Sequence, residues 1–145
     1  MSAQITRVFL DTNVYIVGAA IANSPEAAIL VWLSDSKTPV IVSKELIEQI
    51  ARVARRLQGK DWSGEVLSLL WGFEIVYVIV SDDDARQEAE AIGIPHEDVA
   101  LYLAARSGKA QTFVSANHEL IRALVEKTGD FESLTPEAFL QKYLK

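Results

Sequence analysis

The stretch VFLDTNVYIV, residues 8–17, places a carboxylate and an amide, Asp11 and Asn13, inside a run of mostly apolar residues. Residues 8–10 favour a buried strand, and the residues after Asp11 read as a helix that is apolar around its turn. Moving an ionised carboxylate out of water costs several kcal/mol unless a cation, a metal or hydrogen-bond donors compensate it. We therefore interpret Asp11 as the end of a strand and as a residue that needs a ligand.

Short β-branched runs alternate with longer helical patterns along the whole chain. This alternation is typical of parallel strands joined by right-handed helical crossovers, with helices on both faces of the sheet. We therefore predict an α/β fold, a three-layer α/β/α sandwich with a mainly parallel sheet of four or five strands. The predicted strands are RVFLD (7–11), PVIVS (39–43), EIVYVIV (74–80), QTFVS (111–115) and a weak one near Phe131.

The length and composition fit one domain that spans residues 1–145, half of whose residues are apolar. The absence of cysteine excludes disulfides and thiolate metal sites, which is consistent with a reducing cytoplasm. The sequence contains neither a signal peptide nor an apolar run long enough to span a bilayer, so we expect a cytoplasmic protein without membrane contact. The formal net charge of −6 argues against broad binding to nucleic acid unless basic residues gather locally.

Polar residues follow the predicted strands at the edge where their carboxyl ends meet. Asp11, Ser43 and the step from Ser115 to Asn117 come directly after apolar strands, and Asp98 opens the helical pattern DVALYLAARSG. Ligands bind at this edge of parallel sheets. Helix capping is the alternative interpretation of Ser43 and Asn117, because Ser and Asn are favoured N-caps. Carboxylate and amide oxygens suit Mg²⁺ or Mn²⁺, so we predict a metal held by Asp11 and Asp98.

Four motifs in order resemble the PIN-domain family of metal-dependent ribonucleases, which includes toxins of bacterial and archaeal toxin-antitoxin pairs. The motifs are FLDTNV (9–14), VSKELIEQI (42–50), DVALYLAA (98–105) and TFVSANHEL (112–120). The resemblance covers nearly the whole chain. It implies a PIN-like fold, hydrolysis of RNA, a Mg²⁺ or Mn²⁺ cofactor and, for a toxin, an antitoxin protein as partner.

The family pattern normally supplies four acids to the site, and this chain keeps two of them. Asp11 and Asp98 match the first and third acids, whereas Gln49 and Asn117 stand at the positions of the second and fourth. The carbonyl oxygen of Asn117 can still bind a metal. The loss of two negative charges weakens the attraction for divalent cations, so a second metal should bind poorly.

Two further carboxylates are candidates to complete the metal site. Glu45 lies one helical turn before Gln49 on the same predicted face, and Glu119 follows Asn117 at a position that is often acidic in the family. The family pattern also implies that Asn13 and Ser115 orient the metal-binding carboxylates through hydrogen bonds. The predicted catalytic set is therefore Asp11, Asp98, Asn117, Gln49, Ser115 and Asn13.

The predicted helix from Lys44 to about Lys60 has a basic face that begins at the predicted site. Residues 44–60 hold five cationic and two acidic side chains. At about 100° per residue, one narrow face carries Glu45, Gln49, Arg52, Arg56 and Lys60. The opposite, apolar face carries Leu46, Ile50, Val53, Ala54 and Leu57. We predict that Arg52, Arg56 and Lys60 bind RNA phosphates, and a solvated face with i,i+4 ion pairs is the alternative.

Two functions therefore remain open at the sequence level. The first is a ribonuclease in which a metal held by Asp11 and Asp98 activates water. The second is a catalytically weakened PIN-like module that binds RNA or protein, because Gln49 and Asn117 replace two acids. A phosphatase that uses Asp11 as a nucleophile normally has a second Asp two residues later, where this chain has Asn13.

The three tryptophans bear on the oligomeric state. Large aromatic residues are usually buried in the core or in interfaces rather than free on the surface. We read Trp32, Trp62 and Trp71 as core or subunit contacts, and we expect a homodimer.

Overall fold

Five short strands form one parallel sheet in the order β3-β2-β1-β4-β5. The computed structural model describes residues 5–80 and 83–144. The strands are β1 (Val8–Leu10), β2 (Pro39–Ser43), β3 (Glu74–Val78), β4 (Thr112–Val114) and β5 (Glu132–Leu134). The helices are α1 (Thr12–Ala20), α2 (Pro25–Ser36), α3 (Lys44–Gln58), α4 (Lys60–Ser68), the 3-10 helix η1 (Leu69–Gly72), α5 (Asp83–Ala91), α6 (His96–Ser107), α7 (His118–Lys127) and α8 (Pro136–Tyr143).

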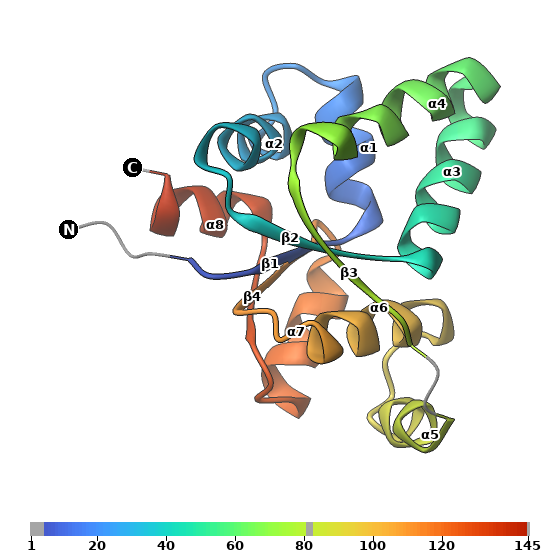
Figure 1. The fold of residues 1–145 in the computed structure, drawn as a ribbon. Helices are drawn as coiled ribbons and strands as arrows, with labels where there is room; N and C mark the ends of the chain where they lie inside the picture. Colours follow the sequence, from blue (N-terminus) through green and yellow to red (C-terminus); the bar gives the residue numbers. More distant parts are fainter. Residues whose placement is uncertain (1–4, 81–82, 145) are drawn as a thin grey trace.

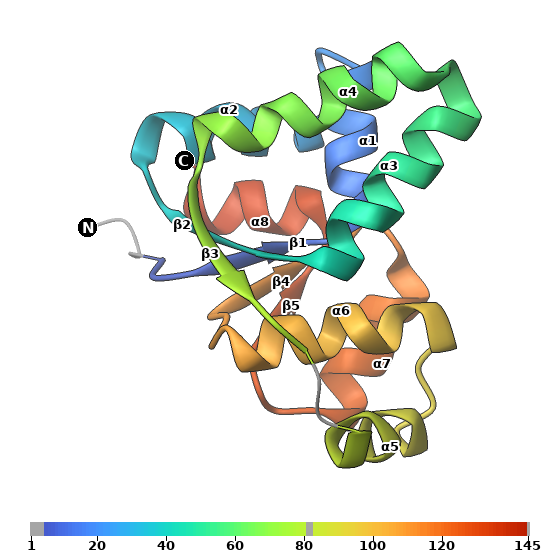
Figure 2. The same ribbon diagram turned by 45° about the vertical axis from the view of Figure 1, so that its right-hand side comes forward.

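The helices cover both faces of this sheet, which confirms the predicted α/β/α sandwich. Figure 1 and Figure 2 show α1, α2 and α8 on one side of the sheet and α6 and α7 on the other. α3 leaves the carboxyl end of β2 and runs back as α4, so that the two helices lie side by side (Figure 1). The helices that carry the predicted site residues therefore converge at the carboxyl edge of the sheet.

β1 lies at the centre of the sheet, and its three residues are fully buried. Phe9 pairs in register with Phe113 of β4, and their stacked rings are 5.0 Å apart. Apolar runs of this kind are expected where a parallel sheet is covered on both faces. The ladder continues past the strand, because the Asp11 amide donates to the Val114 carbonyl at 2.9 Å. The ends of β1 and β4 are thereby held together.

The first two helices meet at a small residue. A Cβ atom added to Gly18 would lie 2.5 Å from Leu30 Cδ1 and 3.2 Å from the backbone of Glu26, so only glycine allows this approach of α1 to α2. No single helix among residues 5–80 and 83–144 is long and apolar enough to cross a membrane. Length and composition would suffice only for α1 and α2 together, which are bent by 100°.

The predicted helix over residues 44–60 is two helices, and this changes two assignments. α3 ends at Gln58, because Gly59 adopts a φ of 91°, a left-handed conformation that favours glycine. Lys60 begins α4 and does not continue the basic face of α3, so its predicted place on that face was wrong. Leu57 is 58% exposed and does not belong to the apolar face that buries Leu46 and Ile50.

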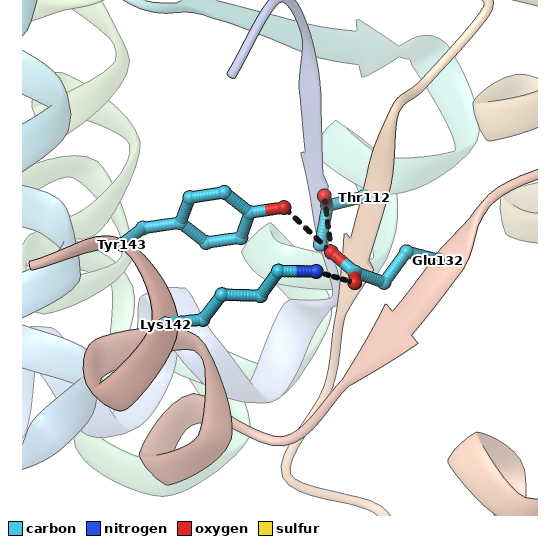
Figure 3. A network of polar contacts seen from close by, with 4 residues as sticks. All are labelled: Thr112, Glu132, Lys142 and Tyr143. Atoms are coloured by element: carbon cyan, nitrogen blue, oxygen red, sulfur yellow. Dashed lines mark hydrogen bonds and ion pairs between the residues drawn. The ribbon is translucent and has the colours of Figure 1, made fainter. Parts of the chain in front are cut away.

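The C-terminal helix is attached to the sheet by a polar network at the edge opposite the carboxyl ends (Figure 3). Glu132, the first residue of β5, accepts hydrogen bonds from the Tyr143 hydroxyl at 2.7 Å and the Thr112 hydroxyl at 3.3 Å. Lys142 forms an ion pair with the same carboxylate. Burial raises the pKa of Glu132, but the bonds from Lys142 and Tyr143 outweigh it and hold that pKa below its usual value. The network therefore stabilises the fold without taking part in the site.

Candidate active site

A cavity of about 330 Å³ opens at the carboxyl edge of the sheet, where β1 and β4 end. All four positions at which the family pattern has acids line it: Asp11 after β1, Gln49 on α3, Asp98 on α6 and Asn117 after β4. These residues are far apart in the sequence, and the crossovers of the fold bring them together. Their chemical roles stay predictions.

Asp11 is almost completely buried, with 5% of its surface exposed, and three donors contact its carboxylate. The Thr12 amide donates to Oδ1 at 2.8 Å, so Asp11 is also the N-cap of α1. The Ser115 hydroxyl donates to Oδ2 at 2.7 Å, and Asn13 Nδ2 lies 3.4 Å from the same oxygen. Burial raises the pKa of Asp11 above its usual value, although these three hydrogen bonds act in the opposite direction.

Asn13 and Ser115 connect the two central strand ends. The Asn13 carbonyl oxygen accepts from the Ala116 amide at 3.0 Å, and its Nδ2 donates to Ser115 Oγ at 3.2 Å. Ser115 Oγ also accepts from the Asn117 amide at 3.0 Å, and Ser115 is completely buried. Both residues therefore restrict the position of the Asp11 carboxylate, and their role in orienting it for a metal stays a prediction.

Asp98 lies in the first turn of α6 and is half-buried. Its pKa is raised from 3.8 to about 6, first by burial and then by the negative charges of Asp11 and Glu97. The effect of Asp11 on Asp98 means that two carboxylates with the same charge share a partly desolvated space. A cation between them would remove both the repulsion and part of the burial cost.

The two amides that stand at acid positions are fixed by hydrogen bonds to their carbonyl oxygens. The Thr12 hydroxyl donates to Gln49 Oε1, and this hydrogen bond connects α1 to α3 at the cavity. Asn117 Oδ1 accepts from the Leu120 amide at 3.2 Å and caps α7. Ser43 caps α3 in the same way, through the Leu46 amide at 3.2 Å. The capping interpretation of Ser43 and Asn117 therefore describes their contacts.

The other predicted ligands lie outside this cavity. Glu45 lines a neighbouring hollow together with residues 77–80, and its Oε1 atom is buried without a hydrogen-bond partner among the described residues. Glu119 lies two residues after Asn117, in the first turn of α7, and is exposed. Neither residue is in the lining of the cavity, and Lys60 is not in it either. Glu45 shares a helical face with Gln49 by spacing, yet it lies next to β3.

Two arginines of α3, Arg52 and Arg56, line the cavity together with the acids. Both side chains are exposed, and neither forms an ion pair within residues 5–80 and 83–144. The only i,i+4 ion pair of α3 in that part of the chain joins Lys44 to Glu48 at 3.8 Å. Ion pairs along α3 therefore do not hold the two arginines, and both interpretations, phosphate binding and a solvated face, stay predictions.

Two polar residues that line the cavity, Thr12 and Glu97, are not among the predicted site residues. Thr12 holds Gln49, and Glu97 adds a third carboxylate beside Asp98. The adjacency of Glu97 and Asp98 in the sequence could have indicated the second of these. In the described part of the chain, no group of three or more His, Cys, Asp or Glu residues could hold a metal ion.

Comparison with known proteins identifies the fold. No protein-family model matches the sequence, and no curated protein matches it significantly. Among solved structures, VapBC2 from Rickettsia felis bound to a DNA fragment from its promoter is similar over 90% of this chain and 98% of that chain, with a TM-score of 0.67 and 16% identity. PAE2754 from Pyrobaculum aerophilum is similar over 94% of this chain and 88% of that chain, with a TM-score of 0.62 and 16% identity.

A third solved structure is that of a toxin. VapC20 from Mycobacterium tuberculosis, described as a Sarcin-Ricin loop cleaving toxin, is similar over 73% of this chain and 86% of that chain, with a TM-score of 0.55 and 15% identity. At 15–16% identity these similarities concern the fold. They confirm that the chain has the PIN-like fold that its four motifs predicted.

Proposed function

We propose that this chain is a divalent-metal-dependent ribonuclease of the PIN type that hydrolyses RNA phosphodiester bonds. The observation that carries the proposal is the lining of one cavity by two desolvated carboxylates, Asp11 and Asp98, and two unpaired arginines, Arg52 and Arg56. Carboxylates suit a divalent cation, and arginines suit phosphate. A nuclease that acts on a charged backbone needs both.

The donor set fits Mg²⁺ or Mn²⁺. Burial raises the pKa of Asp11, and burial and the charge of Asp11 raise that of Asp98, so both carboxylates favour a bound positive charge. Both ions prefer oxygen ligands, and Asp11 and Asp98 would hold one of them. When bound, such an ion supplies a water molecule of lowered pKa and polarises the phosphate.

The residues of the chain itself would orient the reactants. Asn13 and Ser115 fix the Asp11 carboxylate through bonds of 3.4 Å and 2.7 Å. Arg52 and Arg56 would bind the RNA backbone through phosphate contacts, which position a substrate without reading its sequence. No protein nucleophile is needed for hydrolysis of this kind.

A catalytically weakened PIN-like module that binds RNA or protein is the second candidate. The observation in its favour is that Gln49 and Asn117 stand where the family pattern has acids, and that the described residues hold no cluster of three metal-binding side chains. Asp11 in this case would be only a cap that is compensated by its three donors. Such a module would bind RNA through Arg52 and Arg56 and leave it intact.

The proposal includes a toxin role with an antitoxin protein as partner and a cytoplasmic location. The similarity to VapBC2 and to the toxin VapC20 supports the first, and the absence of cysteine is consistent with the second.

A homodimer is also part of the proposal, with the edge strand β3 as the candidate contact for a second copy. Its residues Ile75 and Tyr77, and Ile79 after it, are 43%, 54% and 78% exposed, and Trp71 before it is 90% exposed. An apolar edge strand is a template for pairing with another chain.

Cleavage of RNA with and without metal tests the proposal. The purified protein is incubated with single-stranded RNA and with an RNA that carries the sarcin-ricin loop, in Mn²⁺, Mg²⁺ or EDTA. We expect cleavage in Mn²⁺ or Mg²⁺, none in EDTA, and none with Asp11→Asn. Asp35→Asn is the matched control, because it makes the same chemical change at an exposed residue of α2 outside the cavity. Binding without cleavage in any metal would favour the second candidate, and cleavage that persists in EDTA or in Asp11→Asn would contradict the metal site.

A further inference from the structure

We propose that Gln49 and Asn117 bind a phosphate of the RNA through their side-chain NH₂ groups and are not ligands of the metal. The inference deepens the proposed function and rests on it, because it assigns these two residues to the substrate. Both line the cavity, and each has its carbonyl oxygen engaged by a donor of the protein. The part of each amide that remains for a ligand is the part that donates.

The orientation of the Asn117 amide is determined by a backbone group. The Leu120 N–H can only donate, so the atom that lies 3.2 Å from it is the carbonyl oxygen of Asn117. The Nδ2 group has no hydrogen-bond partner within the described residues, and the side chain is exposed at the cavity. An NH₂ group has two donors and no acceptor, so it suits a phosphate oxygen and cannot bind a cation.

Gln49, on α3, presents the same half of its amide at the cavity. The Thr12 hydroxyl donates to Oε1, and Nε2 has no partner within residues 5–80 and 83–144. Gln49 is half-buried, and a donor that is partly removed from water loses free energy until an acceptor replaces the water. A phosphate oxygen would be such an acceptor.

Asn13 is an amide of the same cavity whose two ends both form hydrogen bonds within the protein. Its carbonyl oxygen accepts from the Ala116 amide, and its Nδ2 donates to Ser115 and lies near Asp11, so both ends are used. Gln49 and Asn117 differ from Asn13 in the unused NH₂ group. That difference separates residues that could contact a substrate from a residue that only positions Asp11.

The distribution of charge around the cavity agrees with this assignment. The acceptors for a cation are the carboxylates of Asp11 and Asp98, whereas Arg52 and Arg56 carry further donors. Two NH₂ groups and two guanidinium groups in one cavity form a set of donors for the non-bridging oxygens of a phosphodiester. An acid at either amide position would repel the same phosphate.

Neutral substitutions that remove only the NH₂ groups test the inference. Gln49→Met removes the amide at similar length, and Asn117→Ser removes it while keeping a side-chain oxygen that can cap α7. Gln58→Met is the matched control on the same helix, because Gln58 is exposed and outside the cavity lining. Circular dichroism and urea unfolding verify that each variant is folded.

Two binding experiments then separate the two roles. Binding of a labelled single-stranded RNA in EDTA is measured by fluorescence anisotropy, and binding of Mn²⁺ alone is measured by calorimetry. We expect each cavity variant to weaken RNA binding about tenfold, the effect of one hydrogen bond to a charged acceptor. We expect Mn²⁺ affinity to stay within about twofold of the wild type, and Gln58→Met to change neither quantity.

The alternatives give different patterns. A loss of Mn²⁺ affinity with unchanged RNA binding in EDTA would make the amides metal ligands and overturn the inference. If neither quantity changed, the two amides would have only their contacts to Thr12 and Leu120, and the inference would be overturned. A wild-type protein that does not bind RNA in EDTA would overturn the inference as well. Failure of the proposed function is seen separately, as wild-type protein that binds RNA but does not cleave it in Mn²⁺ or Mg²⁺.

Discussion

Asp98 should make the metal-free protein less stable as the pH rises, and Asp98→Asn should remove this effect. The folded-state pKa of Asp98 is raised from 3.8 to about 6, first by burial and then by the charges of Asp11 and Glu97. A folded-state pKa above the unfolded-state pKa means that the carboxyl group favours folding below about pH 4. That contribution is lost as the pH rises through about 6.

The size of the effect follows from opposing contributions. A rise from 3.8 to about 6 corresponds to about 3 kcal/mol, and solvent screening at a half-buried group reduces this to about 1.5 kcal/mol. Asp98 also lies in the first turn of α6, where its negative charge is favourable by about 0.5 kcal/mol and is lost in Asp98→Asn. We therefore expect Asp98→Asn to be about 1 kcal/mol more stable than the wild type at pH 7.5 in EDTA, and about equal to it at pH 4.

Urea unfolding followed by circular dichroism in EDTA, at several pH values between 4 and 7.5, measures this difference. Asp35→Asn, at an exposed residue outside the cavity, is the control for the chemical change itself. A difference between Asp98→Asn and the wild type that stays constant over this pH range would refute the reasoning. In Mn²⁺ the wild type should gain stability and Asp98→Asn should gain less, because a ligand that binds only the folded state stabilises it.

Three further predictions concern the rest of the molecule. Replacing Arg52 and Arg56 with Ala should weaken the binding of every RNA sequence and lower the slope of log affinity against log salt concentration by about 0.7 per lost phosphate contact. The free energy of unfolding should change by no more than about 0.5 kcal/mol. An unchanged slope would assign both arginines to solvent. Glu132→Gln should lower the free energy of unfolding at pH 7 by about 0.5–1 kcal/mol after allowance for screening. This loss should vanish as the pH falls below the lowered pKa of Glu132. Urea unfolding at several pH values measures both effects. If β3 pairs two copies, Ile79→Glu should convert a dimer to a monomer in light scattering, whereas Val125→Glu, at a residue of α7 that is 61% exposed, should not.

The positions of the strands could be predicted because the signal is local. PVIVS coincides with β2, and the other runs contain β1, β3 and β4 with one or two extra residues at their ends. β5 lies at Glu132–Leu134, next to the weak signal at Phe131. A parallel sheet that is buried on both faces requires continuous apolar runs, and such runs can be recognised in the sequence.

The boundaries and the side-chain contacts of the site were less predictable. The periodicity of residues 44–60 continues through Gly59, and only the backbone conformation of that residue shows that α3 ends there. Helical spacing places Glu45 and Gln49 on one face, but the neighbours of a face depend on the packing of β3, which spacing does not encode. The Thr12 hydroxyl that holds Gln49 comes from another helix, and no pattern in the sequence links the two residues.

The sequence raises the question of what compensates the burial of the Asp11 carboxylate, and the structure answers it in part. Three donors contact its carboxylate, and this satisfies the hydrogen-bonding rule for buried polar groups. Burial nevertheless keeps its pKa raised, because two of those donors are neutral side chains and the third is a single backbone amide. Another acid at position 49 or 117 would add repulsion to a carboxylate that is already poorly solvated, whereas an amide adds none. The two amides therefore add no further negative charge to that of Asp11, Asp98 and Glu97, and their donors remain for the phosphate that a bound cation would attract.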